Sequence, residues 1–199
     1  MSKRAPRRAP QRRTGRAIVD ALLDAAATLL ATEGLAGMTT NAVATRAGVS
    51  VGSLYQYFPN KQALVAAVAD RVNAGLVAEV ERIVGSEQPP TAKLDALVGL
   101  LCASDLADRA VRRALLRDVP RGWWESGIES SERRVTEHLV PLARALRPAL
   151  DDDEARRRAV LALFVLRGAV QGALVYGPEQ LDEPTMRARL RALALTALD

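Results

Sequence analysis

The sequence has very few of the residues that build disulfides, metal sites and β-sheet cores. It contains one cysteine, Cys102, and one histidine, His138, among 199 residues. A single cysteine cannot form an intramolecular disulfide, and these two residues cannot form a metal cage, so we expect no metal, no cofactor and a reducing cytoplasm. Aromatic residues make up only 4% of the chain, whereas apolar residues make up 49% and are mostly Ala, Leu and Val. This composition favours helices over sheets, and we expect an all-α protein.

Long apolar segments are also missing. Residues 1–16 contain no apolar signal segment, and the longest strongly apolar run, residues 159–166, ends at Arg167. A helix that spans a bilayer needs about 18 to 20 apolar residues. We therefore predict neither a secretion signal nor a membrane span.

The positive charge of the chain is concentrated at one end. The formal net charge is +5, yet residues 1–61 carry nine Lys and Arg against three Asp and Glu. The remaining residues carry 19 basic and 20 acidic groups, so they are almost neutral. A codon bias can explain the preference for arginine over lysine, but it does not explain the shortage of acids in this segment. A basic segment joined to a neutral body is typical of a module that binds a polyanion such as DNA.

Capping and helix-ending residues divide the first third of the chain into short helices. The apolar residues between them recur at helical spacing over residues 14–34, 39–47, 50–57 and 60–83. The two short middle helices, joined by a glycine-containing turn, predict a helix-turn-helix. The residues that we expect to cap or end these helices are Gly34, Thr39 or Thr40, Gly48, Ser50, Pro59 and Asn60.

Five more helices are expected beyond a linker-like stretch at residues 85–90. Pro141 lies inside the third of them and is expected to kink or split it. The expected helices cover residues 93–103, 107–119, 128–146, 154–176 and 185–198.

The helix pattern and the charge together predict three parts of the chain. Residues 1–13 form a disordered basic arm, because they are rich in Pro and Arg and have no apolar periodicity. Residues 14–60 form a helix-turn-helix DNA-binding domain. Residues 61–199 form a larger helical domain, which begins with a connecting helix at 61–84.

The segment from Met38 to Leu64, MTTNAVATRAGVSVGSLYQYFPNKQAL, contains several short motifs in a fixed order. They are Thr-Thr, Ala-Gly-Val-Ser, Gly-x-Leu-Tyr-x-Tyr-Phe and Asn-Lys. In residue type and spacing this segment closely resembles the TetR family of bacterial regulators, and the resemblance covers residues 14–68. It implies a three-helix DNA-binding domain and a larger helical domain that dimerises and binds a ligand, usually in a repressor that the ligand releases.

The second helix of a helix-turn-helix is the one that reads bases. Its N-terminal part enters the major groove. We therefore expect Ser50, Val51, Gly52 and Ser53 to face base edges, and Gly52 permits a close approach to them.

Residues around this helix are candidates for further DNA contacts. Thr40 and Lys61 stand at the starts of two helices, where a hydroxyl, helix-terminal amides and an ammonium can bind phosphates. The resemblance implies that Tyr55 and Tyr57 contact phosphate or the groove wall, and that Asn41 reaches a base. The alternative is purely structural: Thr40 caps a helix, Lys61 is solvated and the tyrosines pack.

The basic arm has two open interpretations. It could reach an adjacent minor groove, as the arms of other helix-turn-helix proteins do. Equally, it could be a solvated arm that adds only non-specific, salt-sensitive affinity.

No set of residues in the sequence predicts catalysis. The helical neighbours of His138 are Val135, Leu139 and Leu142, so a packed or half-exposed histidine is expected rather than a general base. A nucleophile elbow and a phosphate-binding loop are both missing. We therefore do not expect an enzyme.

The last two long helices are the expected dimer interface. Residues 154–176 are apolar almost all round, which predicts a buried helix, and two glycines one turn apart allow a partner helix to approach closely. With residues 185–198 this helix resembles the pair through which family members form a two-fold four-helix interface. Two recognition helices about 34 to 36 Å apart are also needed to read paired half-sites. The candidate interface residues are Val160, Phe164, Gly168, Gly172, Leu190 and Leu193.

The same half of the chain is expected to hold a ligand. Trp123 and Trp124 could line or cover a pocket, or one of them could anchor a loop. Arg167 and Gln171 either orient a ligand or pair with groups at the interface. The apolar candidates would equally pack a dry core. The candidate pocket residues are Leu97, Leu101, Leu116, Trp123, Trp124, Phe164, Arg167 and Gln171.

These features and the family resemblance together predict a homodimeric repressor that binds palindromic operator DNA and that a small apolar or amphipathic effector releases. The resemblance also implies the mechanism, in which the effector binds a pocket shape that exists only when the connecting helix is displaced. Two alternatives remain: a sequence-tolerant DNA-binding protein without an inducer, and a ligand-binding protein whose DNA module is vestigial.

Overall fold

A computed structural model describes residues 15–102, 106–182 and 184–199, and in this part of the chain every regular element is a helix. The all-α prediction is therefore confirmed. The arm at residues 1–13 lies outside the described residues. The first four helices are α1 (Gly15–Gly37), α2 (Thr40–Ala47), α3 (Val51–Tyr57) and α4 (Lys61–Val84).

Side chains cap the helices of the N-terminal domain where the sequence predicts. Thr39, rather than Thr40, caps α2, and its hydroxyl accepts a hydrogen bond from the Ala42 amide at 3.1 Å. Ser50 caps α3 by accepting from the Ser53 amide at 3.0 Å. Asn60 caps α4 in the same way, as its Oδ1 accepts from the Ala63 amide at 2.8 Å. These short-range bonds satisfy amides that a helix start would leave unpaired.

Two glycines make the turns that separate these helices. Gly34 has φ 68°, and it breaks α1 at the predicted position, although the helix resumes and ends at Gly37. Gly48 also has φ 68° and ends α2 in the left-handed conformation. A side chain would be strained at either position, because only glycine adopts positive φ at little cost.

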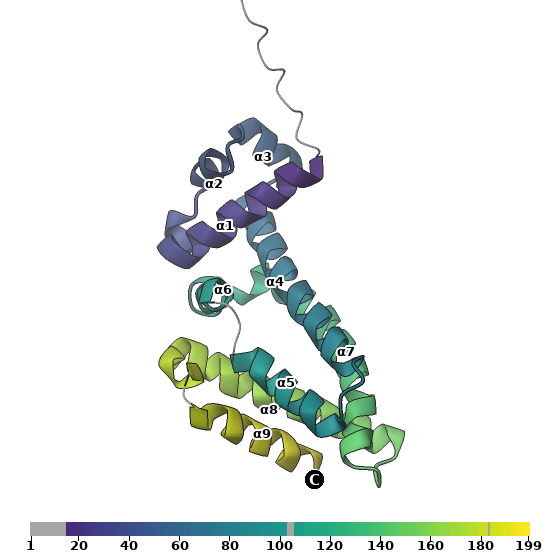
Figure 1. The fold of residues 1–199 in the computed structure, drawn as a ribbon. Helices are drawn as coiled ribbons and strands as arrows, with labels where there is room; N and C mark the ends of the chain where they lie inside the picture. Colours follow the sequence, from purple (N-terminus) through teal and green to yellow (C-terminus); the bar gives the residue numbers. More distant parts are fainter. Residues whose placement is uncertain (1–14, 103–105, 183) are drawn as a thin grey trace, which may run out of the picture.

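Within the described residues, the larger domain adds five α-helices and two short 3₁₀-helices. Figure 1 shows α4 running from the N-terminal domain into this body, where α5, α8 and α9 are stacked. α8 packs against both α7 and α9, and α7 packs along α4. The elements are α5 (Pro90–Cys102), α6 (Leu106–Asp118), η1 (Arg121–Trp123), α7 (Glu125–Leu146), α8 (Asp152–Tyr176), η2 (Pro178–Asp182) and α9 (Pro184–Leu198).

Of the two outcomes expected for Pro141, a kink or a split, the structure excludes the split. Pro141 does not split its helix, since α7 continues as a single helix from Glu125 to Leu146. Proline removes one backbone hydrogen bond and crowds the preceding turn. Packing against α4 and α8 on either side offsets that local cost.

The core of the N-terminal domain extends into the larger domain. One cluster of buried side chains contains Leu22 of α1 and Leu54 of α3 together with Leu115 and Val119 of the α6 region. Trp124, which follows η1, belongs to the same cluster. In Figure 1, α6 lies crosswise beneath α1, and the two helices pack against each other. The DNA-binding part therefore rests on α6 as well as on α4.

The α8 helix contains a long apolar stretch and is only partly covered within the chain. By length and composition alone it could cross a membrane, since its mean hydropathy over an 18-residue window is 1.8. Only 22% of that window is buried within the chain. The same composition is typical of a helix that packs in a core or between subunits.

Candidate nucleic-acid interface and internal cavity

The helix-turn-helix presents its polar side chains on α2 and α3. Leu54 and Phe58 are buried beneath α3, which fixes the opposite face of that helix toward solvent. Tyr55 remains 49% exposed, and its hydroxyl lies 3.2 Å from the Thr40 hydroxyl at the start of α2. This hydrogen bond joins the two helices at their exposed side.

The structure places the expected base-reading residues together at the start of α3. Ser50 and Gly52 are exposed, and Val51 and Ser53 are partly exposed. The Ser50 hydroxyl already caps the helix and pairs with the Ser53 hydroxyl at 2.9 Å. A Cβ on Gly52 would meet only the Ser50 hydroxyl oxygen, at 3.8 Å, so the space in front of this glycine is open.

The flanking candidates have different surroundings. Asn41 is exposed at the start of α2, and Tyr57 is 38% exposed, with its hydroxyl close to Gly15 at the start of α1. Lys61 donates a hydrogen bond to the carbonyl oxygen of Leu35, 26 residues earlier. Partial burial lowers the pKa of Lys61. Its ammonium has three donors, so this bond leaves two for another acceptor.

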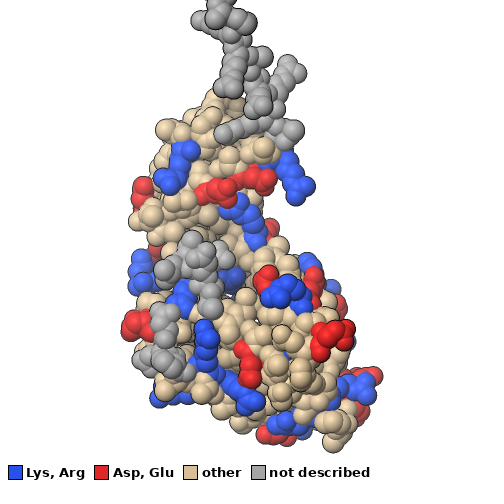
Figure 2. All heavy atoms as spheres, viewed as in Figure 1, with Lys and Arg blue, Asp and Glu red and all other residues tan. Residues whose placement is uncertain are grey.

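Charge is sparse on the described part of this domain. In Figure 2 the upper end of the molecule is mostly uncharged, with separate groups of basic and acidic atoms. α3 itself, with the sequence VGSLYQY, carries no charged residue. Base reading by α3 would therefore depend on hydroxyl, amide and apolar groups, and phosphate binding would fall to its surroundings.

A family profile described as "Bacterial regulatory proteins, tetR family" matches residues 22–68, which include α2 and α3 in full and most of α1. The N-terminal domain belongs to the TetR family. The resemblance stated from the motifs between Met38 and Leu64 is thereby confirmed, and the TetR-family domain is a DNA-binding helix-turn-helix.

Solved structures with the same fold cover nearly the whole chain. A transcriptional regulator from Cytophaga hutchinsonii superposes with a TM-score of 0.72 at 20% identity, over 93% of this chain and 97% of its own. A regulator from Rhodococcus sp. Rha1 has a TM-score of 0.66 at 24% identity, over 94% and 96%. FadR from Bacillus subtilis, solved in complex with stearoyl-CoA, has a TM-score of 0.65 at 17% identity, over 90% and 97%. No curated protein sequence matches the chain.

Beyond the TetR-family domain, the larger domain encloses a cavity of ≈ 380 Å³. This volume is within the range of small-molecule sites, about 300 to 1,000 Å³. Its walls come mainly from apolar side chains of α4, α5, α7 and α8, with α6 and Trp124 at one side. The candidate residues that line it are Leu97, Leu101, Leu116, Trp124, Arg167 and Gln171.

Two candidate pocket residues do not line this cavity. Trp123 lies in η1 and packs instead, half-buried, against the core of the TetR-family domain. Phe164 is 52% exposed on the outer side of α8. The sequence could not separate Trp123 from Trp124, because the geometry of η1 decides which of two adjacent indoles points inward.

Sequence reasoning missed several polar groups of the cavity wall. Arg112 of α6 lines it and donates to the Val72 carbonyl of α4 at 3.3 Å. Glu132 of α7 lines it as well and forms an ion pair with Arg167 of α8. Partial burial, and then the neighbouring charge of Arg121, lower the pKa of Arg167. The run of arginines on α6 was the one available signal, because it interrupts an otherwise apolar face.

The candidate interface residues separate into an outer and an inner group. Phe164 and Leu193 are 52% and 42% exposed, and Gly168 is exposed on the same side of α8. Val160 and Gly172 are partly exposed. Leu190, however, is 1% exposed and packs in the core between α5, α8 and α9, so its prediction as an interface residue is wrong. Leu161 and Tyr176, at 52% and 90% exposed, belong to the outer apolar face and were missed.

A charged cluster joins α4 to α7 beside the cavity. Glu81 Oε1 accepts from Arg134 Nη2 at 2.8 Å and lies 3.1 Å from His138 Nε2. The hydrogen bond from Arg134, followed by that from His138, lowers the pKa of Glu81, although desolvation acts in the opposite direction. His138 is thus a half-exposed histidine with a structural partner, as expected.

This cluster predicts a pH-dependent stability of the α4–α7 contact. Because the pKa of Glu81 is lower in the folded state, its contribution is present above the unfolded-state pKa and is lost as the pH falls through the folded-state value. We expect the thermal midpoint of Glu81→Gln to fall less than that of the wild type between about pH 6 and pH 3. Glu79→Gln is the matched control, since Glu79 pairs within α4 with Arg82. Equal acid sensitivity of the wild type and Glu81→Gln would contradict this role.

Proposed function

We propose that this protein is a homodimeric transcription regulator whose binding to palindromic operator DNA is controlled by a small apolar or amphipathic effector. The observation that carries the proposal is the shared position of Leu115 and Trp124. Both line the cavity, and both belong to the buried cluster that contains the core of the TetR-family domain. A change in the shape of the cavity would therefore act directly on packing beneath the recognition helix.

The proposed DNA contacts fall into two groups. Ser50, Val51, Gly52 and Ser53 face base edges at the start of α3, where all four are at least partly exposed. The second group surrounds α3 and binds the backbone or the groove edge; its members are Thr40, Asn41, Tyr55, Tyr57 and Lys61.

The proposed dimer uses the outer apolar face of α8 and α9. Leu161, Phe164 and Leu193 are each more than 40% exposed on one chain, and Gly168 adds a position without a side chain. Large apolar side chains left exposed in this way are typical of a protein interface. Two-fold pairing through it would also supply the second recognition helix that a palindromic site requires.

The proposed mechanism is a shift between two arrangements of the TetR-family domain. An effector that fits the cavity in only one arrangement favours that arrangement. α4 forms one wall of the cavity and also enters the core of the TetR-family domain through Leu64, Val65 and Val68. Movement of α4 and α6 would change the spacing of the two recognition helices and release the operator. The protein without effector would then act as a repressor. The FadR structure with stearoyl-CoA supports an amphipathic ligand for a domain of this fold.

Selection of duplexes from a random pool by the purified protein tests this function. A specific regulator should bind its selected site about 10³-fold or more tightly than an unrelated duplex at the same salt concentration. Affinities within a few-fold of each other would favour the sequence-tolerant DNA-binding protein instead. Addition of a bacterial metabolite extract should then weaken binding to the selected site. If ligands from the extract bind and operator affinity stays constant, the proposed coupling is wrong.

A further inference from the structure

The indole of Trp124 carries the cavity's most unusual polar group. Trp124 is only 8% exposed, and its Nε1–H has no hydrogen-bond partner among the described residues. Trp124 also lines the cavity. A buried donor without a partner costs about 1 to 3 kcal/mol, so such groups are rare unless something else satisfies them.

The charged groups of the cavity wall do not provide that partner. Glu132 is engaged by Arg167, and Glu79 pairs with Arg82. Because no described residue accepts from this N–H, a molecule inside the cavity would supply the acceptor for Trp124. Because the indole N–H only donates, that molecule would present an acceptor atom, such as a carbonyl oxygen, at this point.

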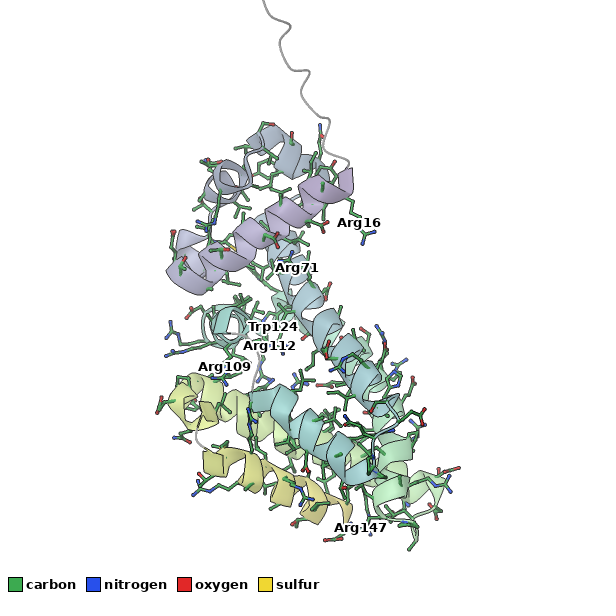
Figure 3. The ribbon with its side chains drawn as sticks, in the orientation of Figure 1. Arg16, Arg71, Arg109, Arg112, Trp124 and Arg147 are labelled. Carbon is green, nitrogen blue, oxygen red and sulfur yellow. The ribbon has the colours of Figure 1, made fainter. Side chains whose placement is uncertain are left out.

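The position of Trp124 defines the orientation of such a molecule. In Figure 3 the indole lies near Arg112, in the region where α6 approaches α4, and both residues line the cavity. The rest of the wall is mostly aliphatic, from residues such as Leu97, Leu139 and Leu166. The acceptor end of a ligand would thus lie beneath the TetR-family domain, and its apolar body would extend toward α5 and α8.

We infer that the effector is an apolar molecule with a neutral carbonyl group, and that its carbonyl oxygen accepts a hydrogen bond from Trp124 Nε1–H. A neutral group is favoured because the charges of the wall balance, with Arg112 and Arg167 against Glu79 and Glu132. This inference rests on the proposed function only in that the bound molecule regulates DNA binding. The binding chemistry itself depends on the cavity and can be measured without DNA.

Two probes of nearly equal shape test the inference by calorimetry on the full-length protein. Benzophenone has a carbonyl where diphenylmethane has a methylene, so only the first can accept from Trp124. We expect the wild type to bind benzophenone about five-fold to ten-fold more tightly than diphenylmethane, the contribution of one net hydrogen bond. Trp124→Phe should remove this preference and leave the affinity for diphenylmethane nearly unchanged.

Trp123→Phe is the matched control, since Trp123 is adjacent but does not line the cavity, and it should retain the preference. Equal affinity of the wild type for both probes, failure of both to bind, or a preference that survives in Trp124→Phe would each overturn the inference. The comparison of probes on the wild type needs no variant, so it holds even if Trp124→Phe folds poorly. Operator affinity measured without any probe separates these outcomes from failure of the proposed function.

Discussion

Replacing Phe164 with arginine is expected to convert the dimer into monomers and to lower operator affinity by at least about 100-fold. The side chain is 52% exposed on α8 and lies in the outer apolar face with Leu161 and Leu193. In a two-fold interface the substitution introduces two buried charges without partners, and such a change costs several kcal/mol. A monomer has one recognition helix and loses the gain from binding two half-sites together.

Sedimentation or light scattering would give the mass, and fluorescence anisotropy the operator affinity. Ala145→Arg is the matched control, because Ala145 is exposed on α7 outside this face and the charge change is the same. If Phe164→Arg stays dimeric, the interface lies elsewhere. A monomeric wild type that binds the palindrome fully would contradict the dimer proposal altogether.

Gly52→Glu is expected to abolish specific DNA binding while leaving the fold intact. A side chain here meets open space within the protein, and a carboxylate in the first turn of α3 suits the positive end of the helix dipole. On DNA, the same carboxylate would occupy the groove and repel phosphate. One such residue per recognition helix, at about 2 kcal/mol each, corresponds to roughly a 10³-fold loss for a dimer.

The matched control is Gly99→Glu, which adds the same charge on α5, also in open space. It should unfold like the wild type and bind the selected operator normally. Gly52→Glu should lose operator affinity while its thermal midpoint stays the same or rises slightly. Normal operator binding by this variant would mean that the start of α3 does not enter the groove.

The ends of the N-terminal helices could be predicted because they depend on residues only a few positions away. The Thr39, Ser50 and Asn60 caps each bond an amide three residues later. The end of α2 likewise depends on a single residue, Gly48, which adopts the left-handed conformation. Such signals remain readable in a single sequence, whatever the rest of the chain does.

Features that depend on distant parts of the chain could not be predicted in the same way. Leu190 and Leu193 are one turn apart on α9, yet Leu190 is buried and Leu193 is 42% exposed, and the pattern of a helix so rich in Ala and Leu does not tell them apart. The bond from Lys61 to Leu35 and the ion pair of Glu132 with Arg167 join residues far apart in sequence. Spacing along one helix carries no information about such contacts.

The buried cluster that joins α1, α3 and α6 limits how this protein can be recombined with its relatives. A chimera that receives residues 15–60 alone would place the α1 surface against a foreign α6, and the apolar side chains that meet there would no longer match. A graft that is meant to change operator preference should therefore include α6 together with residues 15–60. The unit of exchange is set by packing across the junction, and it is discontinuous along the chain.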